Sequence, residues 1–106
     1  MDDEKKLLIN QLIVEVSKLD EEALQQLFDI TKDELYHLTM EYLNDKETRD
    51  RVLSLTYLKV VRRAKYFNSQ TSDGFDWICQ ILKEISSRYQ KKSFNAQEKK
   101  ITNAKK

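Results

Sequence analysis

The chain has 106 residues, enough for one domain but too few for two ordinary ones. It has one cysteine and one histidine, which excludes an internal disulfide and a zinc site made of Cys and His ligands from one chain. Residues 1–50 hold six bases and fourteen acids, a net charge of −8, whereas residues 51–106 hold thirteen bases and four acids, a net charge of +9. This division favours an anionic partner for one half, although small helical proteins also segregate charge by chance.

The chain has no proline and a single glycine, Gly74, which predicts helices joined by short polar loops. The period of the apolar residues predicts a first helix over about residues 4–18. Its inner face is expected to carry Leu8, Leu12, Val16 and Leu19. Asp20 is then a natural N-cap for a second helix that ends near Leu43. The inner stripe of that helix is interrupted only by Thr31, and Phe28 is expected to pack against the third and fourth helices.

The second half predicts two more helices. Residues 44–50 have the composition of a tight turn, with Asp45 or Lys46 leading into a helix over about 47–66. Residues 68–74 are small and polar and predict a loop, whose Ser72 or Asp73 caps a helix over about 75–92. Inward positions on these two helices are Leu53, Tyr57, Val60, Val61, Ala64, Ile78, Ile81, Leu82, Ile85 and Tyr89.

The expected fold class is all-α, a compact bundle of four helices over residues 1–92. After Lys92 the apolar period stops, so residues 93–106 are predicted to form a flexible basic tail.

The sequence predicts neither enzymatic activity nor a cofactor. The only histidine, His37, lies at the edge of a helical stripe and is expected to be structural. Adjacent carboxylates such as Glu21 and Glu22 point about 100° apart on a helix and do not converge. The N-terminus lacks the apolar run of a signal peptide, and no stretch approaches the roughly 18 apolar residues of a membrane span. A cytoplasmic protein with no membrane partner is expected.

The stretch "VVRRAKYFNSQTSDGFDW", residues 60–77, places bases and aromatic residues around the single glycine. Proteins that bind single-stranded nucleic acid place basic side chains along the phosphates and stack aromatic rings on the nucleobases. The candidate DNA-binding residues of this type are Arg62, Arg63, Lys65, Tyr66, Phe67, Trp77, Lys83, Arg88 and Lys91. In the competing structural interpretation, at least two of Phe67, Phe75 and Trp77 close the core where the loop turns back.

Much of the chain resembles region two of bacterial RNA polymerase sigma factors, especially the compact extracytoplasmic-function type. The resemblance covers roughly residues 8–92. It rests on a distributed pattern that includes "DEEAL", "LY", "NDKETRD", "VLSLTYLKVVR" and "FDWICQILKEISSRYQKK". These segments stand at residues 20–24, 35–36, 44–50, 52–62 and 75–92.

The resemblance implies a transcription-initiation module that binds core RNA polymerase and holds the melted −10 promoter strand. The loop that begins at Asn68 would receive a flipped base, in a pocket completed by Tyr66, Phe67 or Trp77. The implied polymerase contacts lie on the outer side of the third helix, at Asp50, Arg51, Ser54, Leu55 and Leu58. No counterpart of the −35-reading domain follows, so a truncated or split sigma factor is expected. A second sigma subunit or an anti-sigma factor would be a further partner.

Some positions depart from the family pattern. Arg51, Ser54 and Leu55 stand where the family usually has D-x-x-Q-E, and Glu84 stands where it has asparagine. Two alternatives therefore remain open: a helical protein-interaction adaptor, and a degenerate sigma relative without promoter binding. Leu55 and Leu58 favour a protein contact, whereas the bases at 62, 63 and 65 favour nucleic acid.

Overall fold

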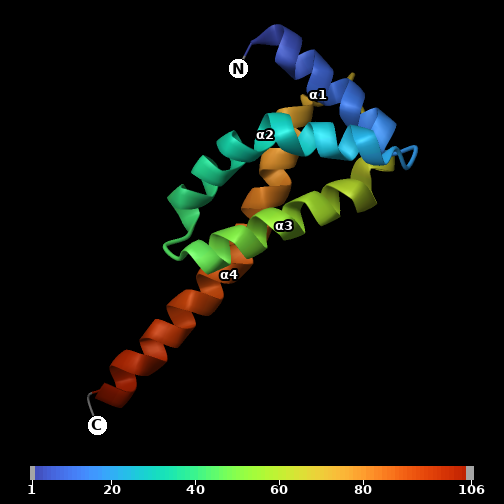
Figure 1. The fold of residues 1–106 in the computed structure, drawn as a ribbon. Coiled ribbons are helices and arrows are strands. Elements are labelled where there is room, and N and C mark those ends of the chain that lie inside the picture. The colour runs from blue at the N-terminus through green and yellow to red at the C-terminus, as the bar shows by residue number, and fades with distance from the viewer. Residues whose placement is uncertain (1, 105–106) are drawn as a thin grey trace.

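The computed structural model describes the backbone of residues 2–104 and the side chains of residues 2–90. The helices are α1 (Asp3–Val16), α2 (Glu21–Tyr42), α3 (Lys46–Arg63) and α4 (Gly74–Ala104), and the 3₁₀ turn η1 (Ala64–Tyr66) follows α3 (Figure 1). The described backbone contains no strand. The predicted all-α class and the four helices are therefore confirmed.

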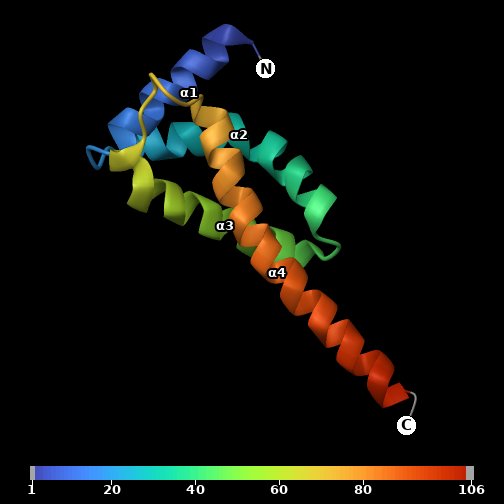
Figure 2. The ribbon, with the colours of Figure 1, turned by 180° about the vertical axis from the view of Figure 1, so that it is seen from behind.

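Helix α4 packs against each of the other three helices. Its second half extends away from them, so that the molecule measures 56 Å along its longest axis and 25 Å across (Figures 1 and 2). The helix continues to Ala104, beyond its predicted end at Lys92. The side chains there lie outside the described residues, so a flexible basic tail over 93–106 stays a prediction.

An aspartate stands at the N-cap position of each of the four α-helices. Asp2, Asp20, Asp45 and Asp73 each accept a hydrogen bond from the backbone N–H three residues later, at 2.8, 3.1, 2.8 and 3.2 Å. These carboxylates satisfy N–H groups that have no partner inside the helix. Bonds from the Thr48 hydroxyl and backbone lower the pKa of Asp45. The predicted caps at Asp20 and Asp45 are confirmed, and Asp73 rather than Ser72 caps α4.

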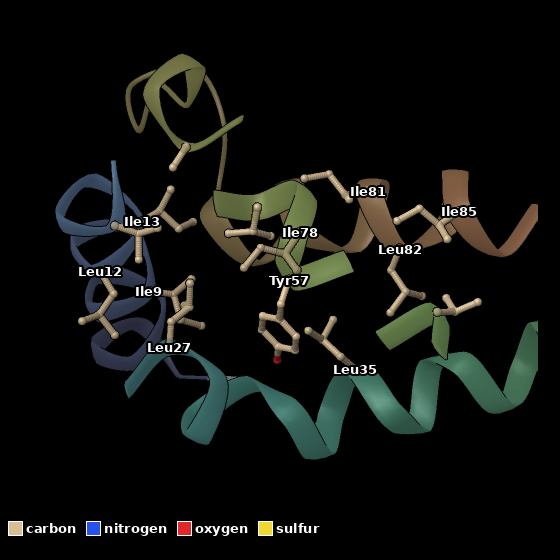
Figure 3. Packing of buried hydrophobic residues seen from close by; sticks show 14 of the residues in the cluster. Ile9, Leu12, Ile13, Leu27, Leu35, Tyr57, Ile78, Ile81, Leu82 and Ile85 are labelled. Carbon is tan, nitrogen blue, oxygen red and sulfur yellow. The ribbon is translucent and has the colours of Figure 1, made fainter. Parts of the chain in front are cut away.

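All four helices contribute to one core, whose side chains converge between the ribbons in Figure 3. The inner face of α1 consists of Ile9, Leu12, Ile13 and Val16. The prediction that Leu19 lies on this face is wrong, because Leu19 is 84% exposed. The physical reason is that α1 ends at Val16, and Leu19 has a left-handed backbone with φ of 66° in the turn to α2.

The centre of the bundle contains a buried polar link between α2 and α3. Thr31 donates a hydrogen bond to the carbonyl of Leu27 at 2.7 Å, and its hydroxyl oxygen lies 2.5 Å from that of Tyr57. The Tyr57 hydroxyl therefore donates to Thr31, and in Figure 3 it points from α3 toward α2. Phe28 packs edge-on against the Tyr57 ring at 4.9 Å, which confirms its predicted contact with the third helix. Thr31 thus lies at the middle of the buried stripe and is fully satisfied.

Gly74 begins α4 where α1 comes close. Its N–H donates to Oδ1 of Asn10 at 2.6 Å. A Cβ at this position would lie 2.6 Å from that oxygen and 2.8 Å from Cδ1 of Ile13. Glycine therefore allows the close approach of two helices, and a larger residue would make the ends of the Asn10 and Ile13 side chains shift. The Asn10 side chain also supplies a partner for an N–H that α4 itself leaves free.

We expect Gly74→Ala to lower the free energy of unfolding by about 1–3 kcal/mol, because the added methyl displaces the side chains of Asn10 and Ile13. Urea denaturation measures this change. Ser69→Ala, an exposed position in the same loop, is the matched control and should stay within about 0.5 kcal/mol of the unaltered protein. A Gly74→Ala protein as stable as the control would contradict the close approach.

Burial raises the pKa of Tyr57 to about 12, above the ordinary value of about 10. The unfolded chain thus ionises this phenol before the folded protein does, so its contribution to stability is present below about pH 10 and is lost between about pH 10 and 12. We expect the free energy of unfolding to fall more steeply over this range in the unaltered protein than in Tyr57→Phe. Urea denaturation at several pH values would reveal the difference, and parallel curves would count against it.

Candidate functional site

Two of the aromatic residues near the loop face each other rather than solvent. The ring centroids of Phe67 and Trp77 are 5.1 Å apart with an interplanar angle of 50°. Both residues are partly buried and pack against the core, as does Phe75. The structural interpretation of these three rings is therefore confirmed. Phe67 and Trp77 join the end of η1 to the first turn of α4, which leaves only part of each ring accessible.

Tyr66 is the exposed ring of this region. Its side chain is 74% exposed, and Nζ of Lys65 lies 5.2 Å from the ring centroid. Arg62, in the last turn of α3, is also exposed. We call Arg62, Lys65 and Tyr66 the α3-end cluster. Cations are favourable at a helix C-terminus, where the macrodipole is negative, so the two bases also stabilise the end of α3.

Arg63 does not belong to the α3-end cluster. Its Nη1 atom lies 3.2 Å from Oε2 of Glu84 on α4. Both side chains are about half exposed, so the pair contributes at most about 1 kcal/mol to stability. It nevertheless neutralises the charge of Arg63. Glu84, which stands where the family pattern has asparagine, is thus an interhelical partner.

The predicted bases of α4 do not form one face. Lys83 and Arg88 are both exposed, but five positions on a helix separate them by about 140° around its axis. Arg88 faces α3, where it lines a groove with Arg62, and Lys83 points away from it. The side chain of Lys91 lies outside the described residues.

The loop after Asn68 forms an open polar pocket of about 340 Å³. Asn68 shapes the loop, because its carbonyl accepts from the N–H groups of Thr71 and Ser72 at 3.2 and 3.0 Å, and its side chain accepts from Gln70 N–H at 2.9 Å. The pocket is lined by Asn10, Ser69, Gln70, Thr71, Ser72 and Asp73. None of Tyr66, Phe67 and Trp77 is among these lining residues. Phe67 and Trp77 pack on each other, whereas the exposed Tyr66 stays a predicted neighbour of a base held by the loop.

A larger groove of about 400 Å³ lies between α3 and α4. Its apolar residues are Leu55, Leu58, Ile85 and Tyr89, and its cations are Lys59, Arg62 and Arg88. We call these seven residues the α3–α4 groove. It unites two leucines predicted to bind polymerase with two arginines predicted to bind DNA. Of the other predicted polymerase contacts, Asp50 pairs with Lys46 at 2.9 Å, and Arg51 and Ser54 are exposed.

Sequence reasoning missed the groove residues Lys59, Ile85 and Tyr89 as binding candidates. A signal was present on α3, where Leu55, Leu58, Lys59 and Arg62 follow the i, i+3, i+4, i+7 spacing of one helix face. The contribution of α4 depends on how the two helices pack, and Ile85 and Tyr89 looked like ordinary core positions.

Cys79, the single cysteine, lies half-buried on α4. Burial, with nearby carboxylates such as Asp76, raises the pKa of Cys79 to about 11, so its thiol stays protonated at neutral pH. Among the described residues, no group of three or more His, Cys, Asp or Glu side chains could hold a metal ion. None of the described helices combines the length and apolar character needed to cross a membrane.

Comparison of the chain with protein-family models, with curated protein sequences and with solved structures gave no match.

Proposed function

We propose that this chain is a transcription-initiation module similar to region two of sigma factors. In this proposal the α3-end cluster and the following loop hold a single DNA strand, and the outer side of α3 contacts core RNA polymerase. The observation that carries it is the α3-end cluster, in which a ring 74% exposed stands beside a lysine directly before an open polar loop. A phenol ring left this accessible is suited to stack on an unpaired nucleobase. The basic side chains beside it are suited to neutralise phosphates.

The order of the helices supports the same proposal. Four helices with a polar loop between the third and fourth match the arrangement that the sequence resemblance implies. On the protein-binding side, Leu58 is 45% exposed on the outer face of α3, beside Leu55 in the α3–α4 groove. An apolar pair at such a position is suited to a protein contact.

A labelled single strand, titrated at several salt concentrations, tests the DNA half. Arg62→Ala should flatten the slope of log affinity against log salt by about 0.7, the value for one phosphate contact on a single strand. Arg63→Ala should flatten it less, because Glu84 already neutralises that arginine. Glu84→Gln should tighten binding and steepen the slope. Tyr66→Ala should cost about 1–3 kcal/mol with little change in slope.

Lys6→Ala, an exposed position on α1, is the control for the titration and should change neither affinity nor slope. The DNA half is overturned if Arg62→Ala leaves the slope unchanged, or if Glu84→Gln weakens binding.

Co-purification with core RNA polymerase tests the protein half. Leu58→Asp should abolish co-purification while circular dichroism reports unchanged helix content, because the side chain is 45% exposed and supports little of the core. Leu7→Asp, at a leucine 67% exposed on α1, makes the same chemical change elsewhere and should have no effect. If the unaltered chain fails to retain polymerase, this half of the proposal is wrong.

The α3–α4 groove favours a second candidate, a helical protein-interaction adaptor without promoter binding. Two features already described fit it better than DNA binding: the neutralised Arg63 and the inward-turned Phe67 and Trp77. The DNA titration separates the two candidates, since an adaptor would lack a tyrosine-dependent affinity for single strands.

A further inference from the structure

The α3–α4 groove combines four apolar residues with three cations. Ile85 is 3% exposed at its base, and Leu55 and Tyr89 are partly buried beside it. Leu58 remains 45% exposed. A solvent-accessible surface of this kind, with no side chain of the described residues covering it, is suited to bury apolar groups of another molecule.

The charged residues that line the groove are all cations. Lys59, Arg62 and Arg88 are among its seven lining residues, and none of the seven is acidic. Among the side chains of residues 2–90, none of these three cations makes an ion pair. The neighbouring Arg63 does find its carboxylate, Glu84, on the opposite helix. The groove therefore presents three cations whose carboxylate partners the described residues do not supply.

We propose that the α3–α4 groove binds an acidic amphipathic helix of a partner protein. The apolar side chains of that helix would occupy the space above Ile85 and between Leu58 and Tyr89. Glu or Asp residues on both of its flanks would pair with Lys59, Arg62 and Arg88. Arginine suits this role because its guanidinium donates two parallel hydrogen bonds to one carboxylate. The inference deepens the protein-binding half of the proposed function and rests on that half, but not on DNA binding.

A helix fits the groove better than a nucleic acid strand does. A groove between two packed helices accepts a third helix that lays its apolar stripe against both. A strand of DNA would need ring faces for its bases, whereas the interior here consists of two leucines, one isoleucine and a single partly buried tyrosine. Aliphatic side chains bury aliphatic partners, and the cations select for acids on either side of them.

Three labelled synthetic helices test the proposal by fluorescence anisotropy with the full chain. One carries leucines along one face and glutamates on both flanks. The second replaces each glutamate by lysine, and the third keeps the glutamates but replaces each leucine by alanine. We expect the first to bind at least about tenfold more tightly than either of the others, since each loss of about 1.4 kcal/mol is a factor of ten.

Charge reversal in the protein sharpens the test. In the double variant Arg62→Glu, Arg88→Glu, the preference should invert in favour of the lysine helix, as expected when complementary charges set specificity. Leu58→Asp should weaken the glutamate helix at least about tenfold. The matched controls Lys6→Glu and Leu7→Asp, both at exposed positions of α1, should bind it as the unaltered chain does.

The proposal is overturned if the glutamate helix does not bind, if the lysine helix binds equally well, or if charge reversal leaves the preference unchanged. These outcomes are separate from failure of the proposed function. Retention of polymerase without binding of the glutamate helix would refute the groove and leave the function standing. The opposite result is also possible. If the unaltered chain binds the glutamate helix, the charge-reversed variant prefers the lysine helix, and the unaltered chain binds neither polymerase nor single-stranded DNA, the groove stands and the proposed function is refuted.

Discussion

The architecture depends on the contact between α1 and the first residue of α4. Because Gly74 has no side chain, α1 approaches until Asn10 bonds to its N–H at 2.6 Å. Cδ1 of Ile13 lies 2.8 Å from the position that a Cβ would occupy. α4 begins at this contact, immediately after the 68–73 loop. The direction of α4 then determines which of its residues meet α3. Trp77 reaches Phe67, Glu84 reaches Arg63, and Arg88 reaches the groove beside Arg62.

The contact between α3 and α4 changes character along its length, and this gradient decides what each part can bind. Near the loop, two rings pack on each other and close the core. In the middle, Arg63 pairs with Glu84, so its charge is less available to a ligand. At the far end, the helices leave a groove where apolar surface and unpaired cations coexist among the described residues. A charge count along the sequence assigns the same +1 to every arginine. The structure separates Arg63, which pairs with Glu84, from Arg62 and Arg88, which form no ion pair with the side chains of residues 2–90.

Much of the fold could be predicted from the sequence, because it follows from local rules. The caps at Asp20 and Asp45 and the inward positions of α4 follow from side-chain chemistry and helical period. Other features depend on tertiary partners and backbone turns, which a pattern does not specify. Thr31 looked like a break in a stripe until Tyr57 supplied a hydrogen-bond donor across the core. Leu19 extended the period of α1, but the left-handed turn after Val16 took it out of the core. The groove was missed for the same reason, since three of its seven residues come from α4 and the other four from α3.

Arg62 belongs both to the α3-end cluster and to the α3–α4 groove, and this shared position couples the two proposed activities. A carboxylate that pairs with Arg62 from within the groove neutralises the charge nearest to Tyr66. A single strand held by the α3-end cluster would then lose about one phosphate contact. By linkage, the strand in turn weakens the acidic helix by the same factor. A partner in the groove would therefore reduce the affinity for DNA without touching the loop or the exposed ring. Lys65, which does not line the groove, would keep part of that affinity, so the two ligands would compete only partly.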